Sequence, residues 1–364
     1  MHRSTARIFV GLLAIAVLGA PIEAQARSAR DHVVARPRAA TRALHVGALG
    51  VAPVRGTTAG GATAGGTTAG GTTAGARAGT KSPSQVLEYH GGPVMHSSTT
   101  YTIYWEPITC GVAPCYVDPV YNAGIDTYFA DAAQDSGTNG NVYSTLNQYY
   151  DLKHGLRRHV EYAQTFGGTY VDTTPFPSNS CTGFHYGTSG VCLSDKQVRK
   201  EVESVITSQG WTGGRSRAFF LMLPKEVDTC YGSSSCAFTQ FCAYHSAFSL
   251  PSGKPAIYAN IPYAGTALRA CASGKTAPNN EDLDATLNAA SHEHREMTND
   301  PFGTAWWDDQ SANEGSDECA YKFGPDLGLG GPNNGSFNQF INGHVYLLQM
   351  EWSNKSIDCK QRGA

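Results

Sequence analysis

The chain has 364 residues and a formal net charge of −3, from 27 Lys and Arg against 30 Asp and Glu. The charge is uneven, because residues 27–85 carry a net +7 and residues 86–364 a net −11. The acidic part has little to neutralise phosphates, so no nucleic-acid partner is expected, and 41% apolar residues exclude collagen, coiled coil and full disorder.

The N-terminus has the pattern of an export signal. Arg3 and Arg7 precede the apolar run Ile8–Leu18, which is too short for a stable membrane span, and Ala24-Gln25-Ala26 fits a cleavage site. We therefore expect residues 1–26 to be a signal peptide and the mature protein to be secreted, without membrane attachment after cleavage. The alternative is an uncleaved membrane anchor.

Residues 27–85 are predicted to be a disordered linker, first basic and then rich in Thr, Ala and Gly. Thr57–Ala76 is four imperfect copies of a Thr-Thr-Ala-Gly-Gly pentapeptide, whose small side chains cannot offset the entropy lost on ordering. A basic tether is the favoured interpretation. Contact with an anionic cell surface and a pro-segment that blocks the cleft of the following domain are the alternatives.

From Val86 to the C-terminus the pattern is that of one α+β domain. Apolar runs that end at a proline or are rich in aromatic residues predict strands, and an apolar stripe behind the N-cap Ser194 predicts a helix. The predicted strands are Thr100–Trp105, Ala218–Leu223 and Ala256–Ile261, and the predicted helices are Ser194–Gly210 and Asn280–Met297.

Ten cysteines, all at or after Cys110, predict five disulfides and an oxidising compartment. The spacing allows three small loops, while the remaining four cysteines need longer ones, and the pairing stays open. A cysteine–zinc site is disfavoured because no C-x₂-C pair occurs. The cysteines near one another in the chain are Cys110 and Cys115, Cys181 and Cys192, and Cys230 and Cys236; the others are Cys242, Cys271, Cys319 and Cys359.

The segment with the clearest chemical pattern is His292-Glu293-His294-Arg295-Glu296, a His-Glu-x-x-Glu motif on the second predicted helix. His292 and Glu296 are four residues apart and therefore project from one face, as the two histidines of the zincin motif H-E-x-x-H do. Zinc accepts carboxylate as well as imidazole ligands. Glu293 has the position of the general base in such enzymes. His294 falls on the leucine-bearing face and is not expected to be a ligand.

A third ligand is expected downstream, at Glu314, because thermolysin-like zincins take theirs from a glutamate about this far along the chain. Asp317 is then the expected second-shell partner that orients His292. These residues predict one Zn²⁺ ion, or another divalent metal. Calcium is a weaker alternative because no EF-hand spacing occurs, and a solvated polar helix face or the relic of a lost site are the others.

His344, Tyr346 and Tyr321 are candidate oxyanion stabilisers that would polarise a carbonyl group, and a purely structural role is the alternative for each. Serine-based catalysis is not supported, because no G-x-S-x-G motif occurs in the chain.

Three blocks of the chain resemble a known family: Leu87–Met95 with Tyr101–Trp105, the His292 helix with Thr298–Gly303, and Asn338–Leu348. They resemble the phosphate-induced protein 1 / EXORDIUM-like family in its bacterial-type form. The resemblance implies a secreted protein, and plant members of the family are linked to cell-wall growth. Bacterial-type relatives carry a motif like the one at His292.

Together these patterns predict a single zincin-like domain over 86–364, with a mixed sheet, an active-site helix and disulfide bonds. The predicted function is that of a secreted zinc-dependent hydrolase, a metallopeptidase acting on a peptide or protein substrate. The alternative is a non-catalytic extracellular protein that binds a cell-wall component or a surface partner and keeps a structural or vestigial metal site.

Overall fold

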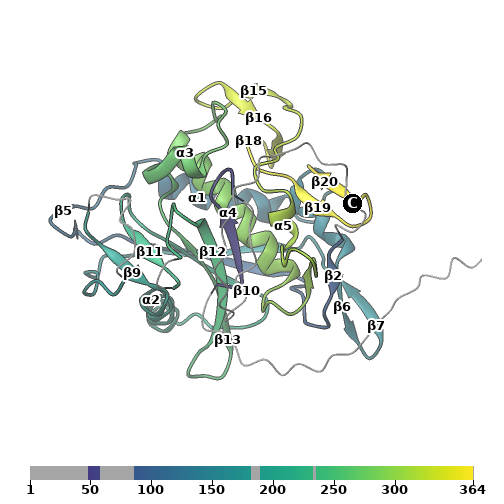
Figure 1. Ribbon diagram of the computed structural model, residues 1–364, viewed down its shortest axis with the longest axis horizontal. Coiled ribbons are helices and arrows are strands. Elements are labelled where there is room, and N and C mark those ends of the chain that lie inside the picture. Colours follow the sequence, from purple (N-terminus) through teal and green to yellow (C-terminus); the bar gives the residue numbers. More distant parts are fainter. Residues whose placement is uncertain (1–47, 58–85, 182–188, 233–234, 364) are drawn as a thin grey trace, which may run out of the picture. The chain divides into compact units, whose positions relative to one another are not determined.

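The computed structural model describes residues 48–57, 86–181, 189–232 and 235–363 (Figure 1). The predicted signal peptide 1–26, and the Thr/Ala/Gly repeat from residue 58 onward, lie outside these ranges. No helix in the described part of the chain is long and apolar enough to cross a membrane.

The largest element is a six-stranded mixed sheet. Its four strands at one side run parallel to each other, whereas the two strands at the other edge are antiparallel to their neighbours. The observed sheet confirms the predicted α+β class. In spatial order the strands are β1 (Gly50–Pro53), β12 (Phe241–Ser249), β13 (Pro255–Ile261), β10 (Arg217–Met222), β3 (Ser98–Trp105) and β8 (Gln164–Asp172).

The described helices are α1 (Tyr121–Gln134), α2 (Asp195–Ser208), α3 (Leu268–Cys271), α4 (Glu281–Asn299) and α5 (Gly315–Glu318), with 3₁₀ segments at Val142–Gln148 and Ala264–Ala267. The remaining strands form small two-stranded pairs. These are β2 (Glu88–Tyr89) with β14 (Trp306–Trp307), β4 (Thr109–Cys110) with β5 (Ala113–Pro114), β6 (Tyr150–Lys153) with β7 (Leu156–His159), β9 (Cys192–Ser194) with β11 (Asp228–Cys230), β15 (Gly328–Gly330) with β16 (Gly335–Phe337), β17 (Gln339–Ile341) with β18 (His344–Tyr346), and β19 (Glu351–Ser353) with β20 (Asp358–Lys360).

The alternation of side chains along the strands places helices on both faces of the sheet. Tyr244 of β12 donates a hydrogen bond to Asp195 of α2, at 2.9 Å, whereas the next residue, His245, faces α4 on the opposite side. Phe220 of β10 contacts Phe129 of α1 and His294 of α4, so α1 and α4 share that second face.

Helix α4 is the element that positions the motif. Asn280 caps it by accepting a hydrogen bond from the Leu283 amide at 3.1 Å, and it ends before Pro301, which disfavours helical geometry in the preceding residue. Every residue of the helix from Leu283 to Asn299 is buried. The sequence predicts an apolar face and a ligand-bearing face, and the structure buries both, because the sheet covers one side and C-terminal segments cover the other.

The predicted elements agree with the structure to within two residues. Helix α2 follows Ser194, whose amide and side chain bond to Gln197 in a capping box, and α4 extends two residues beyond Met297. The predicted strands correspond to β3, β10 and β13. These were the segments with the most regular periodicity and the clearest boundary residues.

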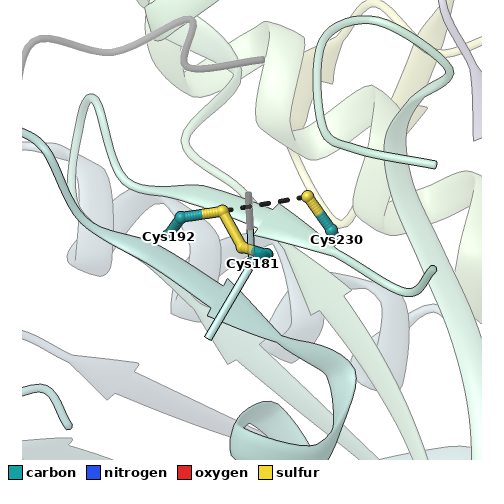
Figure 2. Close-up of side chains that lie close together, drawn as sticks. All are labelled: Cys181, Cys192 and Cys230. Atoms are coloured by element: carbon teal, nitrogen blue, oxygen red, sulfur yellow. Dashed lines mark hydrogen bonds between the residues drawn. A yellow bond between two sulfur atoms is a disulfide. The ribbon is translucent and has the colours of Figure 1, made fainter. Parts of the chain in front are cut away.

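Five disulfides are present, as predicted, and no described cysteine is free. The long-range pairs, which spacing left open, are Cys242–Cys271 and Cys319–Cys359. Two of the three short loops lie against each other, with Sγ of Cys192 3.8 Å from Sγ of Cys230, where β9 pairs with β11 (Figure 2). The short pairs are Cys110–Cys115, Cys181–Cys192 and Cys230–Cys236.

The prediction that 27–85 is entirely a linker is wrong for residues 48–57. These residues include the edge strand β1, which pairs antiparallel with β12, and Ala48, Val51 and Ala52 are buried. The physical reason is local composition, because the apolar run around Val51 precedes the Thr/Ala/Gly repeat and contributes side chains to the core. The repeat itself lies outside the described residues.

A buried carboxyl pair on the α2 face provides a pH-dependent contribution to stability. Burial, with a hydrogen bond and repulsion from Asp172, raises the pKa of Glu201 to about 8. Burial also acts to raise the pKa of Asp172, but hydrogen bonds from Glu201 and Thr174 outweigh it and the net pKa is lowered. The shared proton therefore resides on Glu201.

We expect Glu201→Gln to stabilise the protein at high pH. The pKa of Glu201 is higher in the folded state than in the unfolded state. The protonated Glu201 therefore contributes its full stabilisation below about pH 4.5, and this contribution is lost as the pH rises through about 8. The variant cannot lose this proton, so its free energy of unfolding should exceed that of the wild type by about 1–2 kcal/mol at pH 9, and the gain should vanish near pH 4.5. Denaturant titrations across this range test it, with Glu203→Gln on the same helix as the charge-matched control. A gain independent of pH would contradict the assignment.

Candidate metal centre

The motif residues lie in a buried cluster built from three elements. Helix α4 contributes His292, Glu293 and Glu296, β12 contributes His245, and the start of α5 contributes Glu314 and Asp317. These elements are neighbours: α4 packs against both β12 and α5 (Figure 1). Each of the six side chains is at most 8% exposed.

The donor atoms form two overlapping sets in which all atoms lie within 4.8 Å of one another: His292, Glu296 and Asp317, and His245, Glu293 and Glu296. The predicted ligand Glu314 belongs to neither set and adjoins them through Glu296 and His245. Nε2 of His292 lies 3.0 Å from Oε1 of Glu296 and 3.3 Å from Oδ1 of Asp317. On the other side of Glu296, Oε2 lies 3.7 Å from Nδ1 of His245, whose Nε2 is 3.7 Å from Oε2 of Glu314. The carboxyls of Glu296 and Glu314 also contact each other. Glu296 is therefore the central residue of the cluster.

Donor atoms in this cluster lack hydrogen-bonding partners although they are buried. Six of the eighteen such atoms in the described residues lie in this cluster, and they come from three separate elements. A buried polar atom left without a partner costs about 1–3 kcal/mol, so such a concentration indicates a missing common partner. The atoms are Nε2 of His245, Nε2 of His292, Oε2 of Glu296, both carboxylate oxygens of Glu314 and Oδ1 of Asp317.

The electrostatics of the cluster favour a cation. Burial and mutual repulsion raise the pKa values of Glu296 and Glu314 well above the usual range, and burial raises that of Asp300 to about 6. Burial lowers the pKa of His245 to about 4, so the imidazole does not supply a compensating charge at neutral pH. A divalent cation would compensate the carboxylates and restore their acidity.

Glu293 lies beside Glu296, with donor atoms of the two residues and of His245 all within 4.8 Å of one another, and it has two partners. Its Oε1 accepts a hydrogen bond from the Ala52 amide of β1 at 2.7 Å, and its Oε2 lies 3.1 Å from Nδ1 of His245. Burial raises the pKa of Glu293 to about 8. A carboxyl with a pKa near neutrality, next to the possible ligands Glu296 and His245, suits proton transfer.

Asp317 does not have the role that the sequence predicts. It lies at Nε2 of His292, on the same side as Glu296, while Nδ1 of His292 contacts Nε2 of Gln349 at 3.0 Å. The chain turns into α5 at Glu314, whose amide donates to Oδ2 of Asp317 at 3.3 Å, and this turn brings both acids to the ligand side. Asp317 is thus a candidate ligand, and Gln349 is the residue that orients His292.

The amide of Gln349 controls which nitrogen of His292 is available. Its Nε2 also donates to the Ser316 carbonyl at 2.7 Å, so as drawn it is a donor to Nδ1 of His292, and the ring proton then lies on Nε2. Metal binding through Nε2 requires the proton on Nδ1. In this orientation the Gln349 amide is held by the Ser316 carbonyl and by the Tyr321 amide, and it offers no acceptor to a proton on Nδ1 of His292.

His245 is the site residue that sequence reasoning missed. It is a fully buried histidine in the apolar strand Phe241–Ser249, and neither its spacing nor a motif connects it to His292. One feature of the sequence could have indicated His245: it is a polar residue within an apolar strand, and an imidazole buried at an inward-facing position needs a polar partner.

The three candidate oxyanion residues do not share this location. Nδ1 of His344 contacts Oδ2 of Asp131 at 2.7 Å, and the Tyr346 hydroxyl donates to the same carboxylate. Tyr321 donates to the carbonyls of Pro53 and Ala270, at 2.8 and 3.1 Å. His344 and Tyr346 are therefore joined to α1 instead of the cluster, and Tyr321 contacts β1.

A second group of possible ligands, Glu88, His90 and Asp309, lies at the surface, where His90 stacks on Trp307 with ring centroids 3.3 Å apart. Its two acids are exposed and contact each other. The group lacks the convergence of buried, unpartnered atoms seen around Glu296.

No protein-family model, curated protein or solved structure matches the chain. The resemblance to the EXORDIUM-like family therefore stays a prediction from the blocks named above.

Proposed function

We propose that the protein is a secreted, zinc-dependent hydrolase, a metallopeptidase. The observation that carries the proposal is the convergence of buried, unpartnered donor atoms from His292, Glu296 and Glu314. These residues would hold one zinc ion together with Asp317, whose donor atom lies within 4.8 Å of those of His292 and Glu296. This donor chemistry of nitrogen and carboxylate oxygen suits zinc.

A bound zinc ion would supply Lewis acidity toward a substrate carbonyl. The protein supplies the proton transfer: Glu293, with its raised pKa, accepts a proton from the attacking water and delivers it to the leaving amine. His245, at 3.1 Å from Glu293, fixes the orientation of that carboxyl. The apolar sheet on one side and α5 on the other limit the access of bulk water to the cluster.

The zincin-like architecture is part of this proposal. The motif helix α4 packs on a mixed sheet, and the strand of that sheet next to the edge, β12, is antiparallel to its neighbours. A helix with His and Glu four residues apart, a downstream glutamate and an extended strand beside them are the parts that a metallopeptidase site needs. The five disulfides support secretion into an oxidising compartment.

Metal content tests the proposal directly. The full chain, produced through an oxidising secretory route, should contain about one zinc ion per molecule by mass spectrometry, whereas His292→Ala should contain none. His344→Ala, which replaces an exposed histidine bonded to Asp131, is the matched control and should keep its zinc. A folded wild-type protein that contains no metal and takes up no added zinc would contradict the proposal.

The orientation of Gln349 favours a second candidate, a non-catalytic extracellular protein that binds a cell-wall component. With the amide in this orientation, Nε2 of His292 carries a proton, and protons shared among the carboxyls would stabilise the cluster without a metal, as a vestigial site would require. This candidate predicts no zinc in the folded chain and no peptide hydrolysis.

A further inference from the structure

The edge strand β1 lies directly over the candidate metal centre. In Figure 1 it is the purple arrow beside α4. Gly50 is the point of closest approach: a Cβ atom at this position would collide with Oε2 of Glu314 and would lie 2.5 Å from both Oε2 of Glu296 and Cε1 of His245. Only glycine fits here without displacing the strand or the site, so backbone, rather than a side chain, covers the cluster.

The contacts of β1 are those of a peptide bound in extended form. The strand pairs antiparallel with β12, with Gly50 opposite His245, and the Leu49 amide donates to the His245 carbonyl at 2.9 Å. The Ala52 amide donates to Glu293, the proposed general base. The sheet edge and the site thus bind the same segment.

A separate set of contacts holds the C-terminal end of the segment. The Tyr321 hydroxyl donates to the Pro53 carbonyl at 2.8 Å, and the Arg55 amide donates to the Ala270 carbonyl at 2.7 Å. Tyr321 has a positive φ of 56°, an uncommon conformation for a bulky residue. The hydroxyl of this residue also lies 3.1 Å from the Ala270 carbonyl, so it joins the end of β1 to α3.

We infer that the edge of β12 is the binding site for an extended polypeptide and that β1 occupies this site in the intact chain. The inference rests on the proposed function for the statement that such a polypeptide is a substrate. The ligand class follows from the contacts: main-chain hydrogen bonds to β12, in the manner of β-strand addition, and small residues where the strand passes over the cluster. In the chain itself, these positions are taken by the buried small residues Ala48, Gly50 and Ala52.

Occupation by β1 has a consequence for the proposed reaction. While the Ala52 amide bonds to Glu293 and the Gly50 backbone covers Glu296 and Glu314, neither a water nor a substrate carbonyl can reach these carboxyls. The intact chain is therefore latent, and a peptide can bind only after β1 leaves the edge of β12. Segment 48–57 thus acts as an intramolecular competitor.

Binding of a peptide in trans tests the inference in the full chain. The probe is a fluorescent peptide with the sequence of residues 48–57, and fluorescence anisotropy reports its binding. Gly50→Val should bind it at least tenfold more tightly than the wild type, because the new side chain expels β1 from the chain's own site. A probe with valine in place of the glycine that corresponds to Gly50 should bind at least tenfold more weakly. Thr57→Val, at an exposed position of the same segment, is the matched control and should behave as wild type.

Hydrogen exchange of residues 241–249 provides the second measurement. These amides should exchange faster in Gly50→Val and recover their protection when the peptide is added. Tyr321→Phe, which removes the hydrogen bond to Pro53 without adding bulk, should show the same effect more weakly and serves if Gly50→Val fails to fold. A folded Gly50→Val chain with unchanged exchange and no peptide binding would overturn the inference.

Neither measurement depends on catalysis or on zinc, so the two proposals can fail separately. Peptide binding in a chain that takes up no zinc would support the binding site and contradict the hydrolase. Zinc uptake without peptide binding would leave the hydrolase standing and overturn the inference.

Discussion

Glu293→Gln is expected to reduce peptide hydrolysis by a factor of about 10²–10⁴ while leaving zinc in place, because general-base catalysis contributes about that much. The amide keeps the size of the carboxyl and can still accept the Ala52 hydrogen bond, but it cannot take a proton from water. Turnover of a peptide library, measured beside metal content with and without Glu293→Gln in the Gly50→Val chain, where β1 is expected to leave the site, checks the prediction.

The control for this prediction is Glu318→Gln, which changes an acid of α5 that is not among the proposed ligands or the proposed base. It should retain both zinc and turnover. Unimpaired hydrolysis by Glu293→Gln, with one zinc per chain, would remove Glu293 from the mechanism and leave proton transfer without an identified residue.

Arg295→Met is expected to lower the free energy of unfolding by about 3–5 kcal/mol, because it leaves a buried carboxylate without its cation. Arg295 is fully buried; its NH1 lies 3.0 Å from Oε2 of Glu351 and donates to the Met350 carbonyl at 3.0 Å. Glu351 also accepts a hydrogen bond from Ser316 at 2.7 Å, so the pair joins α4 to α5. Denaturant titration with the disulfides intact measures the loss.

Two further variants isolate the cause of that loss. Glu351→Gln added to Arg295→Met removes the uncompensated charge and should recover part of the stability. Arg158→Met breaks a pair with Asp151 in which the arginine side chain is 46% exposed, and should cost less than about 1 kcal/mol. A loss for Arg295→Met no greater than that of Arg158→Met would show that the buried pair contributes little.

The part of the fold that could be predicted from the sequence is the part specified by local patterns. Helices α2 and α4 begin at Ser194 and Asn280, whose side chains cap them, and the strands β10 and β13 are apolar runs that end near prolines. Within α4, the four-residue spacing of His292 and Glu296 correctly placed their side chains together, since helical geometry alone determines this.

The parts that could not be predicted depend on contacts distant in sequence. His245 reaches Glu293 across 48 residues, and Ala52 reaches it across 241, and neither carries a local pattern that names its partner. The Glu-x-x-Asp spacing at Glu314 resembled a ligand with a second-shell acid, but the turn into α5 places both acids on one side. The apolar character of residues 48–57 is hidden in the average composition of 27–85, because the Thr/Ala/Gly repeat that follows contains no bulky apolar residue.

Two of the disulfides adjoin the cluster, and this gives the order of events in maturation a physical basis. Cys242, three residues before His245, is bonded to Cys271, and Cys319, two residues after Asp317, is bonded to Cys359. Strand β12 and helix α5, which complete the donor set, are thus fixed by disulfide bonds that form only where thiols are oxidised.

In the reducing cytosol, where these disulfides do not form, His292 and Glu296 would face each other without His245 and Glu314 held opposite them. For the proposed zinc site, the metals abundant in the oxidising compartment, rather than those of the cytosol, would therefore determine which ion binds.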